Sequence, residues 1–233
     1  RYGKNIKILK YLISKNITGA PIVASSEVHW NRTKEYYDVS WRGTWEGEGG
    51  GAILIHAIHC HDLLSFVFGD IKSVSANLAT LVNNIETEDS ASITMTTESR
   101  ALISSSITLG AANNTSRLKF IFSNITAESG ENPYAPGEGK WNFTSRDPTK
   151  QNELNEIINL YQKKITPDQD GFRSFFEEIA NHLNGKKFNI IEAWEGLKSI
   201  ELAAAIYYSS MSETKVFLPL DRSNLVYKDW RPK

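Results

Sequence analysis

The side chains best suited to chemistry are concentrated between positions 41 and 62. An aromatic and charged loop comes first, then three consecutive glycines, and then an apolar helix that carries three histidines. In chain order, the notable residues are Trp41, Arg42, Trp45, Gly49, Gly50, Gly51, His56, His59, His61 and Asp62. Imidazole titrates close to neutral pH, so a histidine here could accept a proton from an alcohol while a hydride leaves the same carbon.

The aromatic and basic loop would suit a sugar-like ligand. Trp41 and Trp45 could stack on the face of a sugar ring, and Arg42 could donate hydrogen bonds to hydroxyls or to a carboxylate. The glycines would let a substrate and a cofactor approach the backbone closely, and a helix start leaves N–H donors available. We therefore predict that this loop and helix line a substrate pocket.

A dinucleotide-binding turn is an alternative interpretation of the same glycines. Residues 47–52, Gly-Glu-Gly-Gly-Gly-Ala, formally satisfy the pattern G-x-G-x-x-G/A at the start of a helix. However, Glu46 and Glu48 would place carboxylates beside a pyrophosphate, and a polar aromatic loop precedes the glycines instead of a buried strand. These features argue against a dinucleotide-binding turn.

A metal site is a second alternative. On a helix, His56 and His59 would lie on adjoining turns of one face while His61 points away, so an ion could take two of these ligands but hardly three. We predict no metal site. A histidine in an apolar helix can also be structural and hydrogen-bond to a neighbouring group, which is the interpretation we favour for His61.

Composition argues against several classes of partner. The chain has 233 residues, 40% of them hydrophobic, and we expect one domain over residues 1–233. Its 26 basic and 27 acidic side chains give a net charge of -1, so we expect neither a nucleic acid nor a membrane as partner. Residues 52–68 are about one turn short of the roughly 20 residues that a membrane span needs. Cys60 is the only cysteine, which excludes an internal disulfide and suits a reducing, cytoplasmic compartment.

Hydrophobic periodicity predicts both helices and strands. Helical spacing is found at residues 4–15, 151–164, 168–184 and 192–211. Alternating patterns rich in Val, Ile, Thr and Ser predict strands at residues 22–30, 72–82, 90–98, 101–109 and 116–126. Residues 127–150 are rich in Gly, Pro, Asn and Ser, which predicts a long loop.

The order of these elements predicts an α+β fold. Short connections between the later strands leave no room for crossover helices, so these strands should pair as antiparallel neighbours. We expect an open, mixed but mostly antiparallel sheet of five or six strands with helices packed on one face. The other face would expose apolar surface, and such surface tends to mark an interface, so we expect a homo-oligomer, either a dimer or a tetramer.

Several stretches, taken in order, resemble the C-terminal domain of the glucose-fructose oxidoreductase, inositol dehydrogenase and rhizopine-catabolism (Gfo/Idh/MocA) family of NAD(P)-dependent oxidoreductases. The stretches are Arg1-Tyr2, Gly19-Ala20-Pro21, Gly49-Gly50-Gly51-Ala52, Ile58-His59, Asp62-Leu63-Leu64, Phe68-Gly69, Glu88-Asp89, Glu195-Gly196, Ala205-Ile206-Tyr207 and Leu218-Pro219-Leu220. The match covers nearly the whole chain, and its specificity comes from the order and spacing of these stretches.

The resemblance implies a two-domain enzyme. In the family, an N-terminal Rossmann domain holds NAD or NADP, and a sheet domain shapes the substrate site and the oligomer. The glycine fingerprint and the Glu-Lys-Pro motif with the catalytic lysine of the family would precede Arg1, so we expect this chain alone to bind no cofactor and to be inactive. By resemblance, His59 stands at the active-site histidine and Asp62 at the acidic residue that follows it, while Gly50 and Gly51 would form only a wall of the nicotinamide pocket.

One position departs from the family pattern. Many members have Asp or Asn four residues before the active-site histidine, whereas this chain has Ile55. His56 could substitute, but an α-helix would turn it by about 100° from the face of Ile55.

We predict the substrate-binding and oligomerisation domain of an NAD(P)-dependent dehydrogenase that acts on a sugar, a cyclitol or a related polyhydroxy compound. His59 would be catalytic, and the substrate-binding residues would be Trp41, Arg42, Trp45, His56 and Asp62. The alternative is a non-catalytic ligand-binding or assembly module that retains the same sheet fold.

Overall fold

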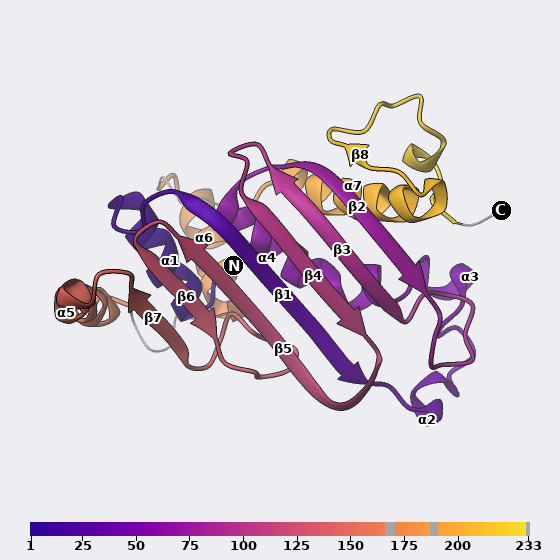
Figure 1. Ribbon diagram of the computed structural model, residues 1–233, viewed down its shortest axis with the longest axis horizontal. Coiled ribbons are helices and arrows are strands. Elements are labelled where there is room, and N and C mark those ends of the chain that lie inside the picture. The colour runs from indigo at the N-terminus through magenta and orange to yellow at the C-terminus, as the bar shows by residue number, and fades with distance from the viewer. Residues whose placement is uncertain (166–170, 187–190, 232–233) are drawn as a thin grey trace.

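The computed structural model describes residues 1–165, 171–186 and 191–231, and it places their strands in one mixed sheet (Figure 1). Within these residues the sheet has eight strands in the order β7-β6-β5-β1-β4-β3-β2-β8. The strands are β1 Pro21–Asn31, β2 Ile71–Ala79, β3 Ser90–Thr97, β4 Leu102–Thr108, β5 Gly110–Phe122, β6 Ile125–Ser129, β7 Trp141–Ser145 and β8 Val216–Phe217. β1 and β4 run parallel, and the other neighbouring pairs are antiparallel.

Most of the longer helices lie on one face of this sheet, and α5 flanks its β7 edge (Figure 1). The longer helices are α1 Lys4–Ser14, α4 Ile58–Phe68, α5 Gln151–Gln162, α6 Gly171–Leu183 and α7 Ala193–Ser212. Two short helices, α2 Lys34–Tyr37 and α3 Trp45–Glu48, lie beyond the strand ends on the side where β1 finishes. The predicted α+β class, with helices on one face of an open and mostly antiparallel sheet, is confirmed.

Alternation along the strands builds the core. In β1, Ala24, Ser26, Val28 and Trp30 are buried, and the residues between them are more exposed. In β5, the ring of Phe120 is fully buried and lies 5.4 Å from the ring of Phe68 on α4. The period of two in the strands therefore selects the face that receives the helices.

The outward face of the sheet is mainly polar. Along β3 and β4 the outward positions are Ser92, Thr94, Ser104 and Ser106, and outward His29 on β1 hydrogen-bonds to Ser106 at 3.0 Å. We expected exposed apolar surface on this face, and along β3 and β4 the structure shows it only near the start of β4, where Leu102 is 56% exposed. Small hydroxyl side chains occupy the centre of the face because only the inward positions must be apolar to bury against helices.

Three details of the strand prediction need correction. The sheet has eight described strands instead of five or six, because the run predicted as one strand at 116–126 covers parts of β5 and β6, and because β7 and β8 were not predicted. The predicted loop at 127–150 contains the end of β6 and all of β7. In β7, Trp141 is buried and stacks on Phe143 and Phe120, so aromatic packing overrides a Gly-rich and Pro-rich environment.

The segment Trp45–Phe68 is longer and more apolar than the sequence pattern indicated. Its 24 residues are enough, by length and composition, to cross a membrane, although 61% of its most apolar part is buried inside the fold. It carries α4, which lies against β1 and α7. The helix therefore has the surroundings of a core helix.

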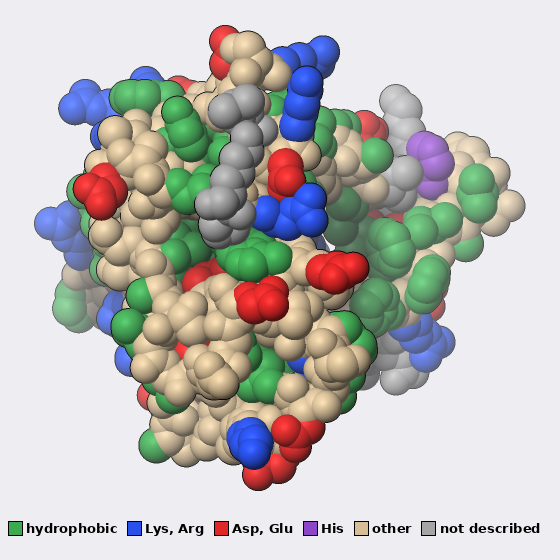
Figure 2. Space-filling model, turned by 90° about the vertical axis from the view of Figure 1, so that its right-hand side faces the viewer, with side chains coloured by type: hydrophobic (Ala, Val, Ile, Leu, Met, Phe, Trp, Pro, Cys, Tyr) green, Lys and Arg blue, Asp and Glu red, His purple; other side chains and the backbone are tan. Residues whose placement is uncertain are grey.

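Helix α6 stands out from the helical layer and exposes apolar side chains, on the right of Figure 2. Phe172, Phe176 and Leu183 are 80%, 62% and 80% exposed. At the start of α7, Trp194 and Leu197 are also half exposed or more. Exposed apolar groups of this size tend to mark a contact surface.

His61 has the structural role that we expected. Its ring is buried between α4 and β4, and Nε2 lies 3.0 Å from the hydroxyl oxygen of Ser105. Burial lowers the pKa of His61 to about 4. The imidazole is therefore neutral in the folded protein at neutral pH.

We predict that His61 makes the protein less stable in acid. Its folded pKa lies below the unfolded value of about 6.5, so protons bind more tightly to the unfolded chain. The contribution of His61 to the free energy of unfolding should be fully present above about pH 6.5 and should be lost as the pH falls towards 4. In His61→Gln the side-chain amide can still hydrogen-bond to Ser105 but does not titrate. Between pH 7 and pH 5 the free energy of unfolding of this variant should therefore fall by about 2 kcal/mol less than that of the wild type.

Urea denaturation at both pH values measures this difference. His29→Gln, a change at an outward-facing histidine, is the matched control and should keep the wild-type pH dependence. Equal pH dependence of His61→Gln and the wild type would contradict the prediction.

Candidate functional site

Three helical forms follow one another in the segment that carries the histidines. The short helix α3 is capped by the hydroxyl of Thr44, which accepts a hydrogen bond from Gly47 N at 3.0 Å. Gly49 ends α3 in the left-handed conformation, with φ of 70°. A π-helix, Ala52–Ala57, then leads directly into α4. Such π-helical turns occur frequently at functional sites because they re-aim the side chains that follow.

A buried carboxylate anchors the start of this segment. Glu88 is 5% exposed, and its Oε1 accepts hydrogen bonds from Ile53 N at 2.9 Å, Gly51 N at 3.1 Å and the hydroxyl of Tyr207 at 2.9 Å. Burial raises the pKa of Glu88, and these donors oppose the rise. The backbone donors at the helix start are therefore already occupied by the protein.

The glycines are required by this anchoring. A Cβ atom on Gly51 would lie 2.1 Å from the carbonyl oxygen of Glu88, and one on Gly50 would lie 2.4 Å from the hydroxyl of Tyr207. Both glycines are buried. Close approach of the chain to Glu88 and Tyr207 accounts for them, and their role as a wall of the nicotinamide pocket stays a prediction.

His56 is buried within an aromatic and basic group of side chains. Its ring meets Trp30 edge-on at 4.9 Å and lies 6.3 Å from the ring of Tyr36. Burial, followed by the positive charges of Arg32 and Arg42, lowers the pKa of His56 to about 4. At neutral pH the imidazole is uncharged and can hydrogen-bond to a ligand without adding charge.

His59 has the opposite environment. It is exposed and lines a cavity of about 460 Å³ between α1, α4, α6 and the loop at 134–138. Tyr134, Gly137 and Phe175 also line this cavity. The ring makes no hydrogen bond to any described residue, so both of its nitrogens are available to a ligand.

Asp62 lines the same cavity but is already paired. Arg1 donates to both carboxylate oxygens, at 2.8 Å and 2.7 Å, and the hydroxyl of Ser199 donates to one of them at 3.0 Å. Burial raises the pKa of Asp62, but the bonds from Arg1 and Ser199 outweigh burial and lower it. The carboxylate joins the N-terminal residues to α4 and α7, and its contact with substrate stays a prediction.

The aromatic loop divides between two places. Arg42 lies over the ring of Tyr36, with 3.9 Å between its Cζ atom and the ring centroid, and half-exposed Trp41 is 5.1 Å from the same Cζ. Trp45 lies elsewhere, because its indole donates to the carbonyl oxygen of Glu86 and its ring packs on Tyr207. Trp45 lines a different cavity from His59. The sequence placed all three in one pocket, whereas the structure brings Arg42 near His56, with Trp41 against Arg42, and places Trp45 elsewhere.

Three residues near His56 were missed by the sequence reasoning. Trp30 and Arg32 stand at the end of β1, and Tyr134 comes from the segment predicted to be a loop. Arg32 Nη1 donates to the hydroxyl of Tyr134 at 3.3 Å, and Tyr134 packs on Trp30 at 4.6 Å. A basic residue directly after a strand was a usable signal for Arg32, whereas nothing local marked Tyr134.

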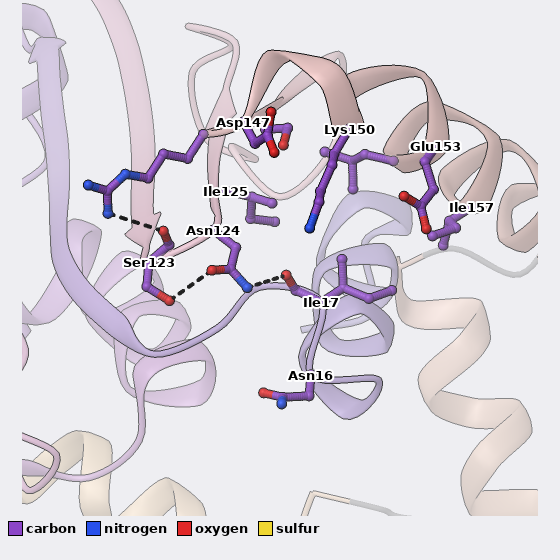
Figure 3. Close-up of a pocket in the computed structure, with 12 residues that line it drawn as sticks. Asn16, Ile17, Ser123, Asn124, Ile125, Asp147, Lys150, Glu153 and Ile157 are labelled. Carbon is purple, nitrogen blue, oxygen red and sulfur yellow. Dashed lines mark hydrogen bonds between the residues drawn. The ribbon is translucent and has the colours of Figure 1, made fainter.

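Another cavity, of about 530 Å³, lies at the opposite end of β1 (Figure 3). Residues of the turn before β1, the β5–β6 turn and the start of α5 surround it, including Asn16, Asn124, Lys150 and Glu153. Asn124 is occupied there, since its amide donates to the carbonyl oxygen of Ile17 at 3.3 Å. No histidine or cysteine lines this cavity. The exposed imidazole of His59 lines the other cavity, of about 460 Å³.

Comparisons with known proteins agree with the fold. No curated protein matches the chain. Among solved structures, one similar protein is the WlbA dehydrogenase of Chromobacterium violaceum in complex with NADH and UDP-GlcNAcA. Its sequence is 28% identical and the TM-score is 0.77, and the match covers 95% of this chain and 61% of the WlbA chain. The WlbA dehydrogenase of Bordetella pertussis, with the same two ligands, is 28% identical with a TM-score of 0.74 and covers 94% and 62%. This chain spans about three fifths of the length of either protein.

More distant structures share the fold. A putative oxidoreductase from Thermotoga maritima is 18% identical, with a TM-score of 0.68 over 94% of this chain and 61% of its own. The model of the oxidoreductase family's C-terminal alpha/beta domain matches residues 10–218. Because that match spans most of the chain, the chain belongs to the Gfo/Idh/MocA oxidoreductase family, of which it is the C-terminal α/β domain.

Proposed function

We propose that this chain is the substrate-binding and oligomerisation domain of an NAD(P)-dependent dehydrogenase for a sugar, a cyclitol or a related polyhydroxy compound. The observation that carries the proposal is His59, an exposed imidazole that has no hydrogen-bond partner among the described residues and lines a cavity of about 460 Å³. The WlbA structures, 28% identical, contain a nucleotide sugar, which supports a polyhydroxy substrate.

In the proposed reaction His59 is the acid–base residue. A neutral imidazole nitrogen would accept the proton of a substrate hydroxyl and return it in the reverse direction. Tyr134 and Phe175, which line the same cavity, would exclude water from one side of the substrate. His56, neutral and fixed by Trp30, would orient the substrate through a hydrogen bond.

The residues described here do not fit the pyrophosphate of a dinucleotide. Gly51 N and Ile53 N, which would face it, both donate to Glu88, and that carboxylate would lie where the phosphates belong. We therefore propose that residues outside this chain hold NAD or NADP, which supplies a hydride acceptor. The exposed apolar side chains of α6 support a contact with such a further domain.

Two further proposals concern the setting of the protein. We propose a homo-oligomer, a dimer or a tetramer, formed through the outward face of the sheet, which the described helices leave uncovered (Figure 1). We also propose a cytoplasmic location, supported by Cys60, a single buried cysteine. Burial raises the pKa of its thiol to about 12, so the thiol is unreactive.

The rival function is a non-catalytic ligand-binding or assembly module. Ile55, at a position that is often Asp or Asn in the family, favours it because an alkyl side chain cannot relay a proton. A screen of the full-length protein with sugars and cyclitols, following both ligand binding and NAD(P) reduction, separates the two functions. Ligand binding without reduction by any substrate would favour the module.

We predict that His59→Ala in the full-length protein lowers kcat by about 100- to 10,000-fold, because general acid–base catalysis contributes about that factor. KM should change little, since the imidazole assists proton transfer in the transition state more than it assists ground-state binding of the substrate. Steady-state NAD(P) reduction with the substrate found in the screen measures both constants. His29→Gln, on the outward sheet face, is the control and should keep the wild-type kcat; an unchanged kcat in His59→Ala would refute the catalytic role.

We also predict that the 233-residue chain by itself binds neither NAD nor NADP and shows no dehydrogenase activity. The physical reason is that Glu88 already occupies the backbone donors at the glycine turn. Isothermal titration calorimetry of the isolated chain measures the binding. Micromolar affinity for either dinucleotide would contradict this prediction.

A further inference from the structure

Two arginines converge at the carboxyl end of β1, beside His56. Arg32 follows the last residue of β1, and Arg42 lies in the loop between α2 and α3. The Cζ atoms of both lie within 5 Å of the centroid of the Tyr36 ring, at 4.8 Å for Arg32 and 3.9 Å for Arg42. Their positive charges therefore share one small region.

Neither guanidinium has an anionic partner among the described residues. The ion pairs found among the described residues involve other basic groups; for example, Arg1 pairs with Asp62 and with Glu195. Arg32 donates only from Nη1, to the carbonyl oxygen of Asn31 and to the hydroxyl of Tyr134. The Nε atoms of both Arg32 and Arg42 are buried and have no hydrogen-bond partner.

Aromatic rings compensate these charges only in part. Arg32 also lies 5.0 Å from the centroid of Trp30 and 5.4 Å from that of Tyr134, and Arg42 lies 5.1 Å from Trp41. Such cation–π contacts stabilise the charge but leave N–H donors in the plane of the guanidinium unused. Two partly buried cations with unused donors are unfavourable unless an acceptor arrives.

The neighbouring titratable groups do not supply that acceptor. His56 faces the two arginines as a neutral imidazole, because burial and their charges lower its pKa to about 4. Tyr36 and Tyr134 present their ring faces to the arginines, and the Tyr134 hydroxyl accepts a hydrogen bond from Arg32. The planar forks of two arginines match the oxygens of a carboxylate or a phosphate, which is the chemistry this region lacks.

The region adjoins the His59 cavity. Tyr134, which accepts the hydrogen bond from Arg32, also lines that cavity together with His59. His56, whose pKa is lowered by burial and by both arginines, lies three residues before His59, which lines the cavity.

We propose that Arg32 and Arg42 form an anion subsite that holds a carboxylate or phosphate group of the substrate beside His59. The proposal rests on the proposed function and narrows the substrate class to acidic or phosphorylated sugars. Tyr36 would position both guanidinium groups, and neutral sugars and cyclitols would lack the group that this subsite binds.

Calorimetric titration of the full-length protein with three probes tests the subsite: glucuronate for a carboxylate, glucose 1-phosphate for a phosphate, and glucose as the neutral reference. At least one anionic probe should bind about 10-fold or more tightly than glucose, because a charge-assisted hydrogen bond contributes about that factor or more. The better of the two anionic probes identifies the group that is bound. Wild-type protein that binds neither of them more tightly than glucose overturns the proposal.

Two substitutions assign the effect to the arginines. Arg32→Gln and Arg42→Gln should each weaken binding of the better anionic probe by about 10- to 100-fold and leave the affinity for glucose unchanged. Arg222→Gln removes an exposed arginine elsewhere and should change neither. Unchanged anion binding in both subsite variants would overturn the proposal.

Salt dependence provides a readout that needs no variant. Binding of the better anionic probe to the wild type should weaken as the sodium chloride concentration is raised, while binding of glucose should not. The reason is that dissolved ions screen the attraction between the anion and the arginines, and glucose carries no charge. The same affinity for the anion at low and high salt would count against the subsite.

Failure of the subsite and failure of the catalytic proposal are distinguishable. Arginine-dependent binding of an anionic sugar without NAD(P) reduction would support the subsite and contradict the dehydrogenase. Reduction of NAD(P) by neutral sugars alone, unaffected by Arg32→Gln and Arg42→Gln, would support the dehydrogenase and contradict the subsite.

Discussion

The candidate site depends on the hydrogen bonds that Glu88 accepts. This carboxylate precedes β3 and binds Gly51 N, Ile53 N and the hydroxyl of Tyr207, so it joins the sheet, the π-helix and α7 at one buried point. The histidines that follow are placed by that junction. Because a buried carboxylate without donors would be strongly unfavourable, the three donors and the charge stabilise one another, and the chain has little freedom to shift along the helix axis.

The π-helix determines how the two imidazoles differ. In a regular α-helix, residues three apart lie on adjoining turns of one face, which was the expectation for His56 and His59. Here the π-helix ends at Ala57, between them, so His56 belongs to the wider turn and packs on Trp30, while His59 lies in the first turn of α4 and lines an open cavity. The apolar pattern of residues 52–58 is compatible with either helical form, and sequence reasoning had no signal for the difference.

Much of the fold could be predicted because each long element has one apolar face. The helix predicted at 4–15 is observed at Lys4–Ser14, and the one predicted at 192–211 at Ala193–Ser212. β7 was missed because its five residues lie among glycines and prolines, and it is held by stacking on distant aromatic rings. A mixed sheet was predicted, but the sequence did not indicate that β1 and β4 are the parallel pair, since that pairing depends on where the intervening helix places the chain.

The site was predictable only where its residues are neighbours in sequence. His59 and Arg42 belong to one segment, whereas Arg32 and Tyr134 reach it through the sheet and a distant loop. Spacing cannot show which groups the protein itself satisfies. Asp62 and Trp45 both have the right chemistry for a ligand, but Arg1 and Glu86 already bind them. Groups without a hydrogen-bond partner among the described residues, such as the imidazole of His59 and the Nε atoms of Arg32 and Arg42, are consequently better indicators of a ligand than side chains selected by residue type alone.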